Sequence, residues 1–525
     1  MKHRPLDDVS TASPRRQGGE SQAAVFVPAL TIVSHPLASR VGERLVLDAL
    51  PRGREVAVSR NAPLFTQVGE AVGRPLGDPF VSRKPLRFQA RSDGGVRLEG
   101  DPDGTRVVAG GMAGVSWEFR PEALAAGVSL ELAGRVVLWL HRVAQDDLGT
   151  TDTLGMVGQG PALNRVRTRV RQVADLEVPV LIRGETGTGK ELVARALHLH
   201  GPRRDGPFVS VNLGTLAREL ASAELFGVQR GAYTGASRSR EGFFRAAQGG
   251  TLFLDEVGEA SSEVQVALLR VLETGEVFPV GAHAPIATDV RLVAATDAPL
   301  EELIAQGRFR APLLHRLSGY SIHMPPLRER REDLLLLFHH FARRELEALG
   351  EAGRLSPEDP YAEPWLPAAL ATRLLCHEWS GNVRQLRNVA RQLVISGRGQ
   401  PRLQADAALE AGLTPGREVG LATLVSSSRR RPSEVTEAEL LSALRECSWD
   451  LKATAERLGI TRASLYNLVD RSPDIRTVRD LGAEEITRCF HACGGDLDAM
   501  VRRLEVSRRA LQRRVRELGL EAHDS

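Results

Sequence analysis

The sequence predicts a multidomain protein: an N-terminal β-sandwich, a central α/β domain with a helical lid, and an all-α helix-turn-helix region at the C-terminus. Three observations support this fold class. Short β-type runs separated by Gly, Pro and Asp fill residues 23–145, and strands alternate with helical patterns over 154–333. The last 90 residues contain a helical repeat. A chain of 525 residues is also too long for a single hydrophobic core.

The composition excludes several classes of protein. With 42% hydrophobic and 26% charged residues, the chain is expected to be globular. It has neither an apolar run long enough for a membrane helix nor a signal peptide. Four cysteines cannot form a disulfide scaffold, so a reduced, cytoplasmic setting is expected. Two of them, Cys489 and Cys493, lie four residues apart and fit the buried face of a helix better than a metal site. A balance of 69 basic against 66 acidic residues excludes a uniformly basic coat but allows basic patches.

Composition shifts divide the chain into seven segments. The expected segments are a disordered tail (1–22), a β-sandwich (23–145), an α/β subdomain (154–333), a helical lid (334–398), a linker (399–435) and two helix-turn-helix repeats (436–475 and 482–520).

A phosphate-binding loop follows the first strand of the α/β region. Strands are expected over 178–183, 207–212, 250–256 and 289–296. The loop lies between the first strand and a helix, and its glycines direct backbone N–H groups at phosphate oxygens while its lysine adds a point charge. The candidate ATP-binding residues are Gly184, Glu185, Thr186, Gly187, Thr188, Gly189, Lys190 and Glu191.

Two adjacent acids end the apolar strand at 250–256. The usual Ser/Thr ligand for Mg²⁺ after the lysine is replaced by Glu191, so metal binding must depend on another group. Asp255 is the candidate ligand for Mg²⁺, through water, and Glu256 is the candidate base that activates the attacking water. The sequence therefore predicts an ATPase that uses ATP and Mg²⁺.

At this point the chain resembles the sigma-54-dependent transcriptional activators of the AAA+ class. GETGTGKE (184–191) is similar to the phosphate loop of this family, in which glutamate after the lysine is usual. ELFGVQRGAYTGA (224–236) resembles the family's GAFTGA loop, which contacts the sigma factor and which other AAA+ branches lack. The resemblance implies that the sigma-contact residues are Gly231, Ala232, Tyr233, Thr234, Gly235 and Ala236.

The resemblance also assigns roles to individual polar residues. It implies that Asn212 holds the catalytic glutamate and that Thr296 is the first sensor. It implies that Arg310 and Arg316 reach the nucleotide of a neighbouring subunit in a ring, which is expected to be a hexamer. It also implies that Arg384 is the second sensor, in the lid.

Two departures from the family pattern bear on the ATPase. Asp297 replaces an asparagine, and a carboxylate beside phosphate is unfavourable unless it points away. Ala311-Pro312 replaces an acid pair, and the proline is expected to alter the helix that carries Arg316.

The C-terminal repeat has an offset of 46 residues, which aligns 450–470 with 496–516. The first unit resembles the Fis-type helix-turn-helix, and its candidate DNA contacts are Thr461, Arg462, Ser464, Tyr466 and Asn467. The second unit has Glu505 where the turn glycine is expected, which makes its turn less certain. Its basic helix favours phosphate contact through Arg508, Arg509 and Arg513, with a hairpin used only for dimerisation as the alternative.

The N-terminal sandwich resembles a forkhead-associated (FHA) domain, a reader of phosphothreonine peptides. Segments 53–60 and 76–88 resemble its conserved turns and give Arg60, Ser82 and Arg83 as candidate phosphate ligands. The family's histidine is absent and Asp103 replaces an asparagine, so a degenerate sandwich kept for protein contacts is the alternative.

The resulting prediction is a bacterial transcription activator that binds upstream DNA, remodels the sigma-54 RNA polymerase closed complex, and receives input through its N-terminal domain. The expected partners are sigma-54 RNA polymerase, upstream DNA, and a phosphothreonine protein or serine/threonine kinase, with no membrane. The alternatives are a DNA-binding regulator with a weak or vestigial ATPase and a AAA+ machine of another kind, such as a helicase loader or unfoldase.

Overall fold

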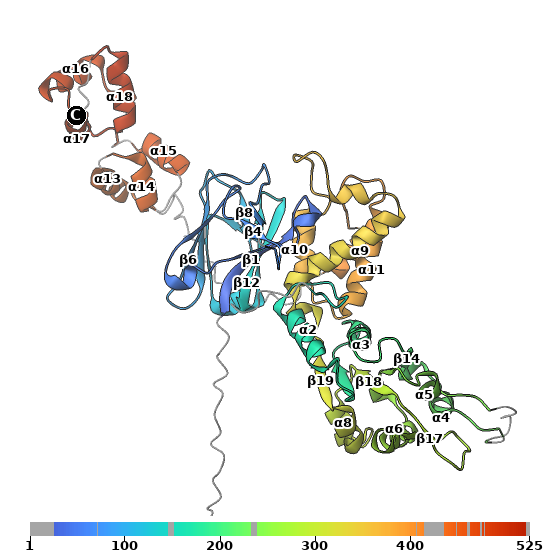
Figure 1. The fold of residues 1–525 in the computed structure, drawn as a ribbon. Coiled ribbons are helices and arrows are strands. Elements are labelled where there is room, and N and C mark those ends of the chain that lie inside the picture. Colours follow the sequence, from blue (N-terminus) through green and yellow to red (C-terminus); the bar gives the residue numbers. More distant parts are fainter. Residues whose placement is uncertain are drawn as a thin grey trace, which may run out of the picture. The chain divides into compact units, whose positions relative to one another are not determined.

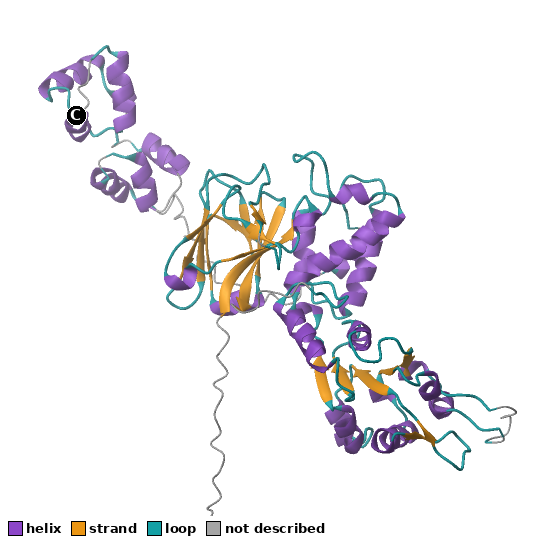
Figure 2. Cartoon of the chain, in the orientation of Figure 1, coloured by secondary structure: helices purple, strands orange, loops and turns teal. Residues whose placement is uncertain are grey.

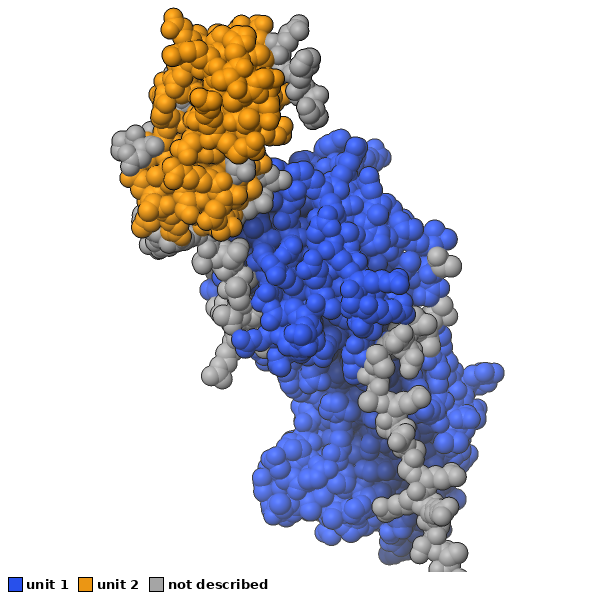
Figure 3. All heavy atoms as spheres, turned by 90° about the vertical axis from the view of Figure 1, so that its left-hand side faces the viewer, with its two compact units in different colours: residues 1–422 blue, residues 423–525 orange. Residues whose placement is uncertain are grey.

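The structure, a computed structural model, forms two compact units, residues 1–422 and 423–525, which Figure 3 colours separately. The first unit combines a sandwich, an α/β domain and a lid, and the second is helical (Figures 1 and 2). No described helix is long and apolar enough to span a membrane. The predicted tail over 1–22 lies outside the described residues, which are 26–70, 72–144, 152–230, 232, 239–405, 407–413, 435–447, 449–458, 462–472, 475–476 and 478–520.

Two antiparallel sheets build the sandwich, with strand orders β5-β4-β2-β1-β12-β11-β8-β9 and β10-β7-β6-β3. Strands of the small sheet alternate buried and exposed residues, as expected for a sheet with one face in a core. The strands are β1 (Phe26–Ser34), β2 (Arg44–Val46), β3 (Val56–Val58), β4 (Phe65–Thr66), β5 (Gly73–Arg74), β6 (Leu86–Ala90), β7 (Val96–Glu99), β8 (Val107–Ala109), β9 (Met112–Gly114), β10 (Ser116–Phe119), β11 (Val128–Leu132) and β12 (Val136–Ala144), with helices η1 (Ala38–Arg40), η2 (Leu50–Arg52) and α1 (Pro121–Ala126).

The central α/β domain has a parallel five-stranded sheet in the order β14-β15-β18-β13-β19. The four strands expected from the sequence all form, and the edge strand β19, which is only four residues long, was not predicted. The elements are β13 (Val180–Arg183), β14 (Phe208–Asn212), β15 (Thr251–Asp255), β16 (Glu276–Val277), β17 (Ile286–Ala287), β18 (Arg291–Thr296) and β19 (Tyr320–His323), with α2 (Pro161–Val173), α3 (Lys190–Leu199), η3 (Leu213–Thr215), α4 (Arg218–Phe226), α5 (Phe243–Ala246), η4 (Val257–Glu259), α6 (Ser262–Thr274), α7 (Leu300–Ala305) and α8 (Ala311–Leu317).

The lid is helical, as predicted, and its core extends past residue 398. Leu403 and Leu413 are buried in the same apolar cluster as the long lid helices, so part of the segment expected to be a linker packs on the lid. The elements are η5 (Leu327–Glu329), η6 (Arg331–Asp333), α9 (Leu334–Ala348), η7 (Ala352–Leu355), α10 (Ala368–Cys376), α11 (Asn382–Ser396) and α12 (Ala407–Gly412). Residues 414–434 of the predicted linker lie outside the described part of the chain.

The sandwich and the lid share one apolar cluster. Strands β1 and β12 are buried along almost their whole length, although a strand with one covered face would alternate. Val33, Val137 and Trp139 belong to the same buried cluster as the residues of α9 and α10. The outer face of the large sheet is therefore covered by the lid.

The C-terminal unit contains two three-helix repeats around one core. Each helix of the second repeat begins and ends 46 residues after its counterpart in the first. The elements are α13 (Glu437–Glu446), α14 (Leu451–Leu458), α15 (Arg462–Arg471), η9 (Val478–Asp480), α16 (Ala483–Ala492), α17 (Leu497–Leu504) and α18 (Arg508–Glu517). Cys489 lies in this core, and the described residues contain no group of three or more His, Cys, Asp or Glu side chains placed to hold a metal ion together.

The turn of the second repeat forms despite its missing glycine. Glu505 ends α17 in the left-handed conformation, with φ of 52° and ψ of 49°, and its N–H donates to the carbonyl of Val501. A non-glycine residue in this conformation costs about 1–2 kcal/mol, so the turn between α17 and α18 forms with local strain.

Candidate active site

The phosphate-binding loop connects β13 to α3, the context that the motif requires. Gly187 has a φ of +77°, and a Cβ built there would lie 2.5 Å from the carbonyl oxygen of Gly381 in the lid. Only glycine allows this approach, so the loop and the lid are in direct backbone contact.

Lys190 begins α3 and lies buried inside the loop. Its ammonium donates to the carbonyl oxygens of Gly184, at 2.8 Å, and Glu185, at 3.3 Å. Burial lowers the pKa of Lys190, and the opposing charges of Asp255, Asp297 and Glu256 act in the other direction. Carboxylates at the ends of β15 and β18 are therefore near enough to act on the charge of the one cation of the loop.

The acid pair at the end of β15 is held by the backbone. Asp255 Oδ1 accepts a hydrogen bond from the N–H of Glu256 at 3.0 Å, and Glu256 adopts a left-handed φ of 57°. Such a conformation costs about 1–2 kcal/mol, and strain of this kind is often found at functional sites. The acid pair therefore lies on a strained turn directly after β15.

Asn212 lies at the same sheet edge as the acid pair. It ends β14, directly opposite Asp255 in the parallel register. Its Oδ1 accepts from the N–H of Gly214 at 2.8 Å, and a Cβ built on Gly214 would lie 2.3 Å from Glu256 Oε2 and 3.2 Å from Asn212 Oδ1. The predicted asparagine and the predicted base are therefore neighbours.

The first-sensor position ends β18 beside the loop. Thr296 is buried, its hydroxyl accepts from the N–H of Ala298 at 3.0 Å, and its carbonyl accepts from the N–H of Gly184 at 3.2 Å. The next residue, Asp297, accepts a short hydrogen bond from the hydroxyl of Thr186. The carboxylate of Asp297 is therefore turned toward the loop, which is the orientation that the electrostatic cost beside a phosphate disfavours.

The N-terminus of the lid helix α11 rests on the phosphate loop. The N–H groups of Val383 and Arg384 donate to the carbonyl of Gly187 at 3.0 and 3.3 Å. This contact brings Arg384, the predicted second sensor, beside the loop and close enough to Lys190 to affect its pKa.

Sequence reasoning missed two further polar residues of the site. Asn382 is fully buried, and its amide donates to Glu185 Oε2 and to the carbonyl of Thr186, both at 3.1 Å. Arg328 forms a bidentate pair with Glu185, at 2.8 and 2.5 Å, which together with Asn382 lowers the pKa of Glu185 to about 2. Asn382 lies within the segment WSGNVRQL that pointed to the lid; Arg328 left no signal beyond its arginine-rich surroundings.

The two arginines expected to act on a neighbouring subunit are exposed at α8. Arg316 approaches Glu273 at 3.6 Å, and Arg310 lies just before the helix and borders a surface hollow of about 450 Å³. Pro312 occupies the first turn of α8, where no intrahelical hydrogen bond is lost. The expectation that this proline alters the helix is wrong, because α8 begins there and continues to Leu317.

Residues 156–323 match the Sigma-54 interaction domain, and residues 328–407 match the AAA+ ATPase lid domain. The DNA-binding transcriptional regulator NtrC of Escherichia coli K12 is 38% identical over 372 residues, covering 70% of this chain and 71% of its own length. The chain belongs to the sigma-54-dependent transcriptional activators. The C4-dicarboxylate transport regulator DctD of Pseudomonas aeruginosa is 41% identical and covers 59% of this chain and 63% of its own. A crystal structure of NtrX from Brucella abortus in complex with ATP is 30% identical, covers 70% of each chain and has a TM-score of 0.43.

As a sigma-54-dependent activator, the protein is an ATPase. Membership of the family implies an oligomeric AAA+ assembly and sigma-54 RNA polymerase as partner. The glycine-rich loop, the buried lysine and the nearby carboxylates fit a nucleotide with its divalent cation, because they pair N–H donors and a cation for phosphate with oxygen ligands for metal.

The predicted sigma-contact loop lies between α4 and α5 in the chain. The bridge between Val228 and Arg240 closes its base, and the N–H of Ala232 donates to Gln229. The other predicted loop residues lie outside the described part of the chain: Gly231, Tyr233, Thr234, Gly235 and Ala236.

The candidate DNA contacts of the activator lie on α15 and α18. Tyr466 and Asn467 are exposed and Ser464 is half-buried on α15. Arg508 and Arg513 are exposed on α18, where Arg508 also pairs with Asp498 at 3.0 Å. Thr461 and the side chains of Arg462 and Arg509 lie outside the described residues.

The candidate phosphopeptide residues of the sandwich meet at one loop. The N–H of Arg60 donates to the carbonyl of Ser82 at 3.1 Å, and the Arg60 guanidinium donates to the carbonyl of Pro79 at 2.9 Å. Arg83 follows and is exposed. The structure therefore brings Arg60 onto the loop that carries Ser82 and Arg83.

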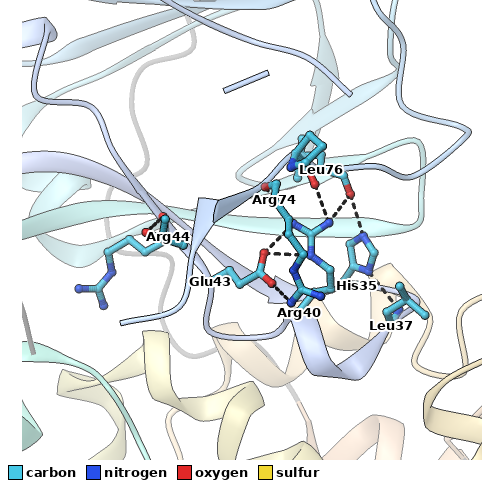
Figure 4. A network of polar contacts seen from close by, with 9 residues as sticks. His35, Leu37, Arg40, Glu43, Arg44, Arg74 and Leu76 are labelled. Atoms are coloured by element: carbon cyan, nitrogen blue, oxygen red, sulfur yellow. Dashed lines mark hydrogen bonds and ion pairs between the residues drawn. The ribbon is translucent and has the colours of Figure 1, made fainter. Parts of the chain in front are cut away.

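A buried polar network holds the strand that leads into this loop. Arg40 lies between Glu43 and Leu76 (Figure 4). Its guanidinium contacts Glu43 at 2.6 Å and donates to the carbonyls of Pro75 and Leu76 at 2.6 and 2.8 Å. His35 donates through Nε2 to the Leu76 carbonyl, and burial lowers the pKa of His35 to about 4, so the ring stays neutral. The network fixes the backbone immediately before residue 77.

Proposed function

We propose that this protein is an ATP-driven activator that binds upstream DNA and opens the sigma-54 RNA polymerase closed complex through its GAYTGA loop, residues 231–236. The observation that carries the proposal is the meeting of the loop lysine Lys190, the acid pair at Asp255 and the lid helix α11 at one sheet edge. The matched sigma-54 interaction family supports the partner.

In this proposal the phosphates lie on the N–H groups of residues 184–191 and against Lys190. Asp255 would hold Mg²⁺ through water, and the cation would supply positive charge to the phosphates. Glu256 takes the proton of the attacking water, and Asn212 holds that carboxylate beside Gly214 until the nucleotide is bound. Thr296 and Arg384 contact the nucleotide from the sheet edge and from the lid.

The ring, which we propose to be a hexamer, completes the site. Arg310, just before α8, and Arg316, on α8, are both exposed, and in the proposed ring they reach a neighbouring subunit's nucleotide. An arginine supplied in trans contributes about 10³–10⁵ in rate in related phosphoryl-transfer systems. Hydrolysis is then a property of the assembly.

We expect ATP turnover per chain to rise with protein concentration, and two inactive variants to restore each other. Arg316→Ala keeps an intact site but lacks the arginine, whereas Glu256→Gln keeps the arginine but lacks the base. Mixing them places an intact site beside an intact arginine, so turnover should return. ATPase rates of each variant alone and of the mixture check this. A mixture as inactive as its components would show that Arg316 does not act between subunits.

The N-terminal sandwich is proposed as the input domain, reading a phosphothreonine peptide through Arg60, Ser82 and Arg83. Its loop is in contact with the lid: Arg135 pairs with buried Asp78 at 3.0 Å and donates to the Pro360 carbonyl of the lid at 3.1 Å. Phe80 meets Tyr361 edge-on at 6.1 Å. These contacts give a phosphopeptide a direct route to the ATPase. A serine/threonine kinase is the proposed source of the signal and the cytoplasm the proposed location.

Phosphothreonine peptides should bind the full chain and lose affinity in Arg60→Ala and Ser82→Ala. Charge-assisted hydrogen bonds to the phosphate are worth about 1.5–3 kcal/mol each, or roughly a 10- to 150-fold loss in affinity. Titration by fluorescence anisotropy, with the unphosphorylated peptide as control, measures the effect. Equal binding by both variants and wild type would refute these residues as ligands and favour a sandwich kept for protein contacts.

A further inference from the structure

The two C-terminal repeats are joined into one body. Their buried residues form a single apolar cluster that includes Leu444 and Leu465 of the first repeat and Leu504 and Leu511 of the second. A shared core fixes the two repeats relative to each other, whereas separate cores would let the short connection at 472–482 act as a hinge.

A polar contact reinforces this junction. Arg445 at the end of α13 pairs with Glu505 in the second repeat, with Nε at 3.0 Å from Oε1. The counterparts of these residues 46 positions away are His491 and Gly459, which cannot form the same pair. The side chain of the strained Glu505 therefore makes an ion pair that glycine could not make. This ion pair has no equivalent at the matching positions of the other repeat, so the junction is asymmetric.

The second helices of the two repeats carry unlike side chains at equivalent positions. Asn467 on α15 corresponds to Arg513 on α18, and Tyr466 corresponds to Gln512. Both Asn467 and Arg513 are exposed. Asparagine pairs well with adenine in the major groove, whereas arginine prefers guanine or phosphate.

Both helices border one basic hollow of about 960 Å³ (Figure 1 labels α15 and α18). Its wall includes Tyr466 from α15 and Arg513 from α18, and in total four arginines against one glutamate. A surface with this excess of positive charge suits an anionic polymer, and an exposed helix on each side suits a double helix read at two places.

We propose that a single chain holds two different DNA-reading helices in one unit and recognises a duplex with two unlike half-sites. A pair of identical helix-turn-helix units from two chains would instead read a palindrome. This inference rests on the DNA-binding role in the proposed function and specifies how the site is read: α15 reads base edges in one half-site, and α18 holds the phosphates and a guanine-containing second half-site.

The test is selection of bound duplexes by the full-length chain from a pool with a randomised central segment, followed by titration of the selected duplex. The expected motif has two half-sites of different sequence. Asn467→Ala should relax base preference in one half only. Arg513→Ala should weaken binding about 5- to 150-fold through the other half, and lower the slope of log affinity against log salt by about one. Arg488→Ala, an exposed arginine on α16, is the matched control.

The inference would be overturned, with DNA binding intact, if the selected motif were an inverted repeat of one half-site. In that case Asn467→Ala would relax base preference equally in both halves, and Arg513→Ala would bind as Arg488→Ala does. If no duplex is enriched at all, the DNA-binding role itself fails, and the inference fails with it.

Discussion

Replacing Glu256 by glutamine is expected to stop ATP hydrolysis while leaving ATP binding intact. Glutamine keeps the shape of the side chain against Gly214 but cannot take a proton from water. A positioned general base contributes about 10²–10⁴ in rate, so kcat should fall by that factor, with little change in nucleotide affinity. Single-turnover hydrolysis and equilibrium ATP binding measure the two quantities separately.

Glu259→Gln provides the control for this change, because Glu259 is an exposed acid three residues further along the chain. It should hydrolyse ATP at the wild-type rate. Turnover in Glu256→Gln equal to that of Glu259→Gln would contradict the role of Glu256 as base.

Removing the ammonium of Lys190 is expected to abolish useful ATP affinity. Lys190 is the buried cation of a loop that otherwise faces Asp255, Glu256 and Asp297. Without this ammonium, the negatively charged phosphates of ATP would lie near these carboxylates with no positive charge to offset the repulsion. Loss of one charged hydrogen bond costs about 1.5–3 kcal/mol, roughly a 10- to 150-fold rise in Kd, and the uncompensated repulsion adds to this.

Replacing Asp297 by asparagine is expected to have the opposite effect and to tighten ATP binding. This change removes a negative charge beside the loop but keeps a hydrogen-bond acceptor for Thr186. Titration with ATP should show weaker binding by Lys190→Ala and tighter binding by Asp297→Asn. If Lys190→Ala bound ATP as wild type does, the placement of the phosphates on this loop would be wrong.

The motifs located most of the nucleotide site because each of them is continuous in sequence. The loop at 184–191 and the acid pair at 255–256 follow apolar strands, and parallel strands bring their carboxyl ends to one edge. Glu185 contacts Arg328, 143 residues further along the chain, and Asn382, 197 residues further, and nothing in the chain near Glu185 indicates these partners.

The packing of the sandwich on the lid was likewise missed, although a signal existed. The run over Ala23–Val33 is apolar without alternation, which indicates a strand buried on both faces. Helices α9 and α10 cover the second face of this strand. Their position there depends on contacts between distant segments, which the local sequence pattern does not encode.

The direction of the Asp297 side chain also could not be predicted from sequence. Electrostatics favours a carboxylate that avoids a phosphate site, but a hydroxyl donor at Thr186 and the cation at Lys190 offset that cost locally. Such compensation depends on distances that only the folded chain fixes.

The most direct test of the central claim is promoter opening by purified protein, ATP and sigma-54 RNA polymerase, measured with wild type and with Thr234→Ala. Wild type should open the promoter only with hydrolysable ATP, and Thr234→Ala should hydrolyse ATP normally yet leave the promoter closed. Failure of wild type to open a promoter that a related activator opens would contradict the claim, and opening by Thr234→Ala as efficient as that by wild type would contradict the role of the loop.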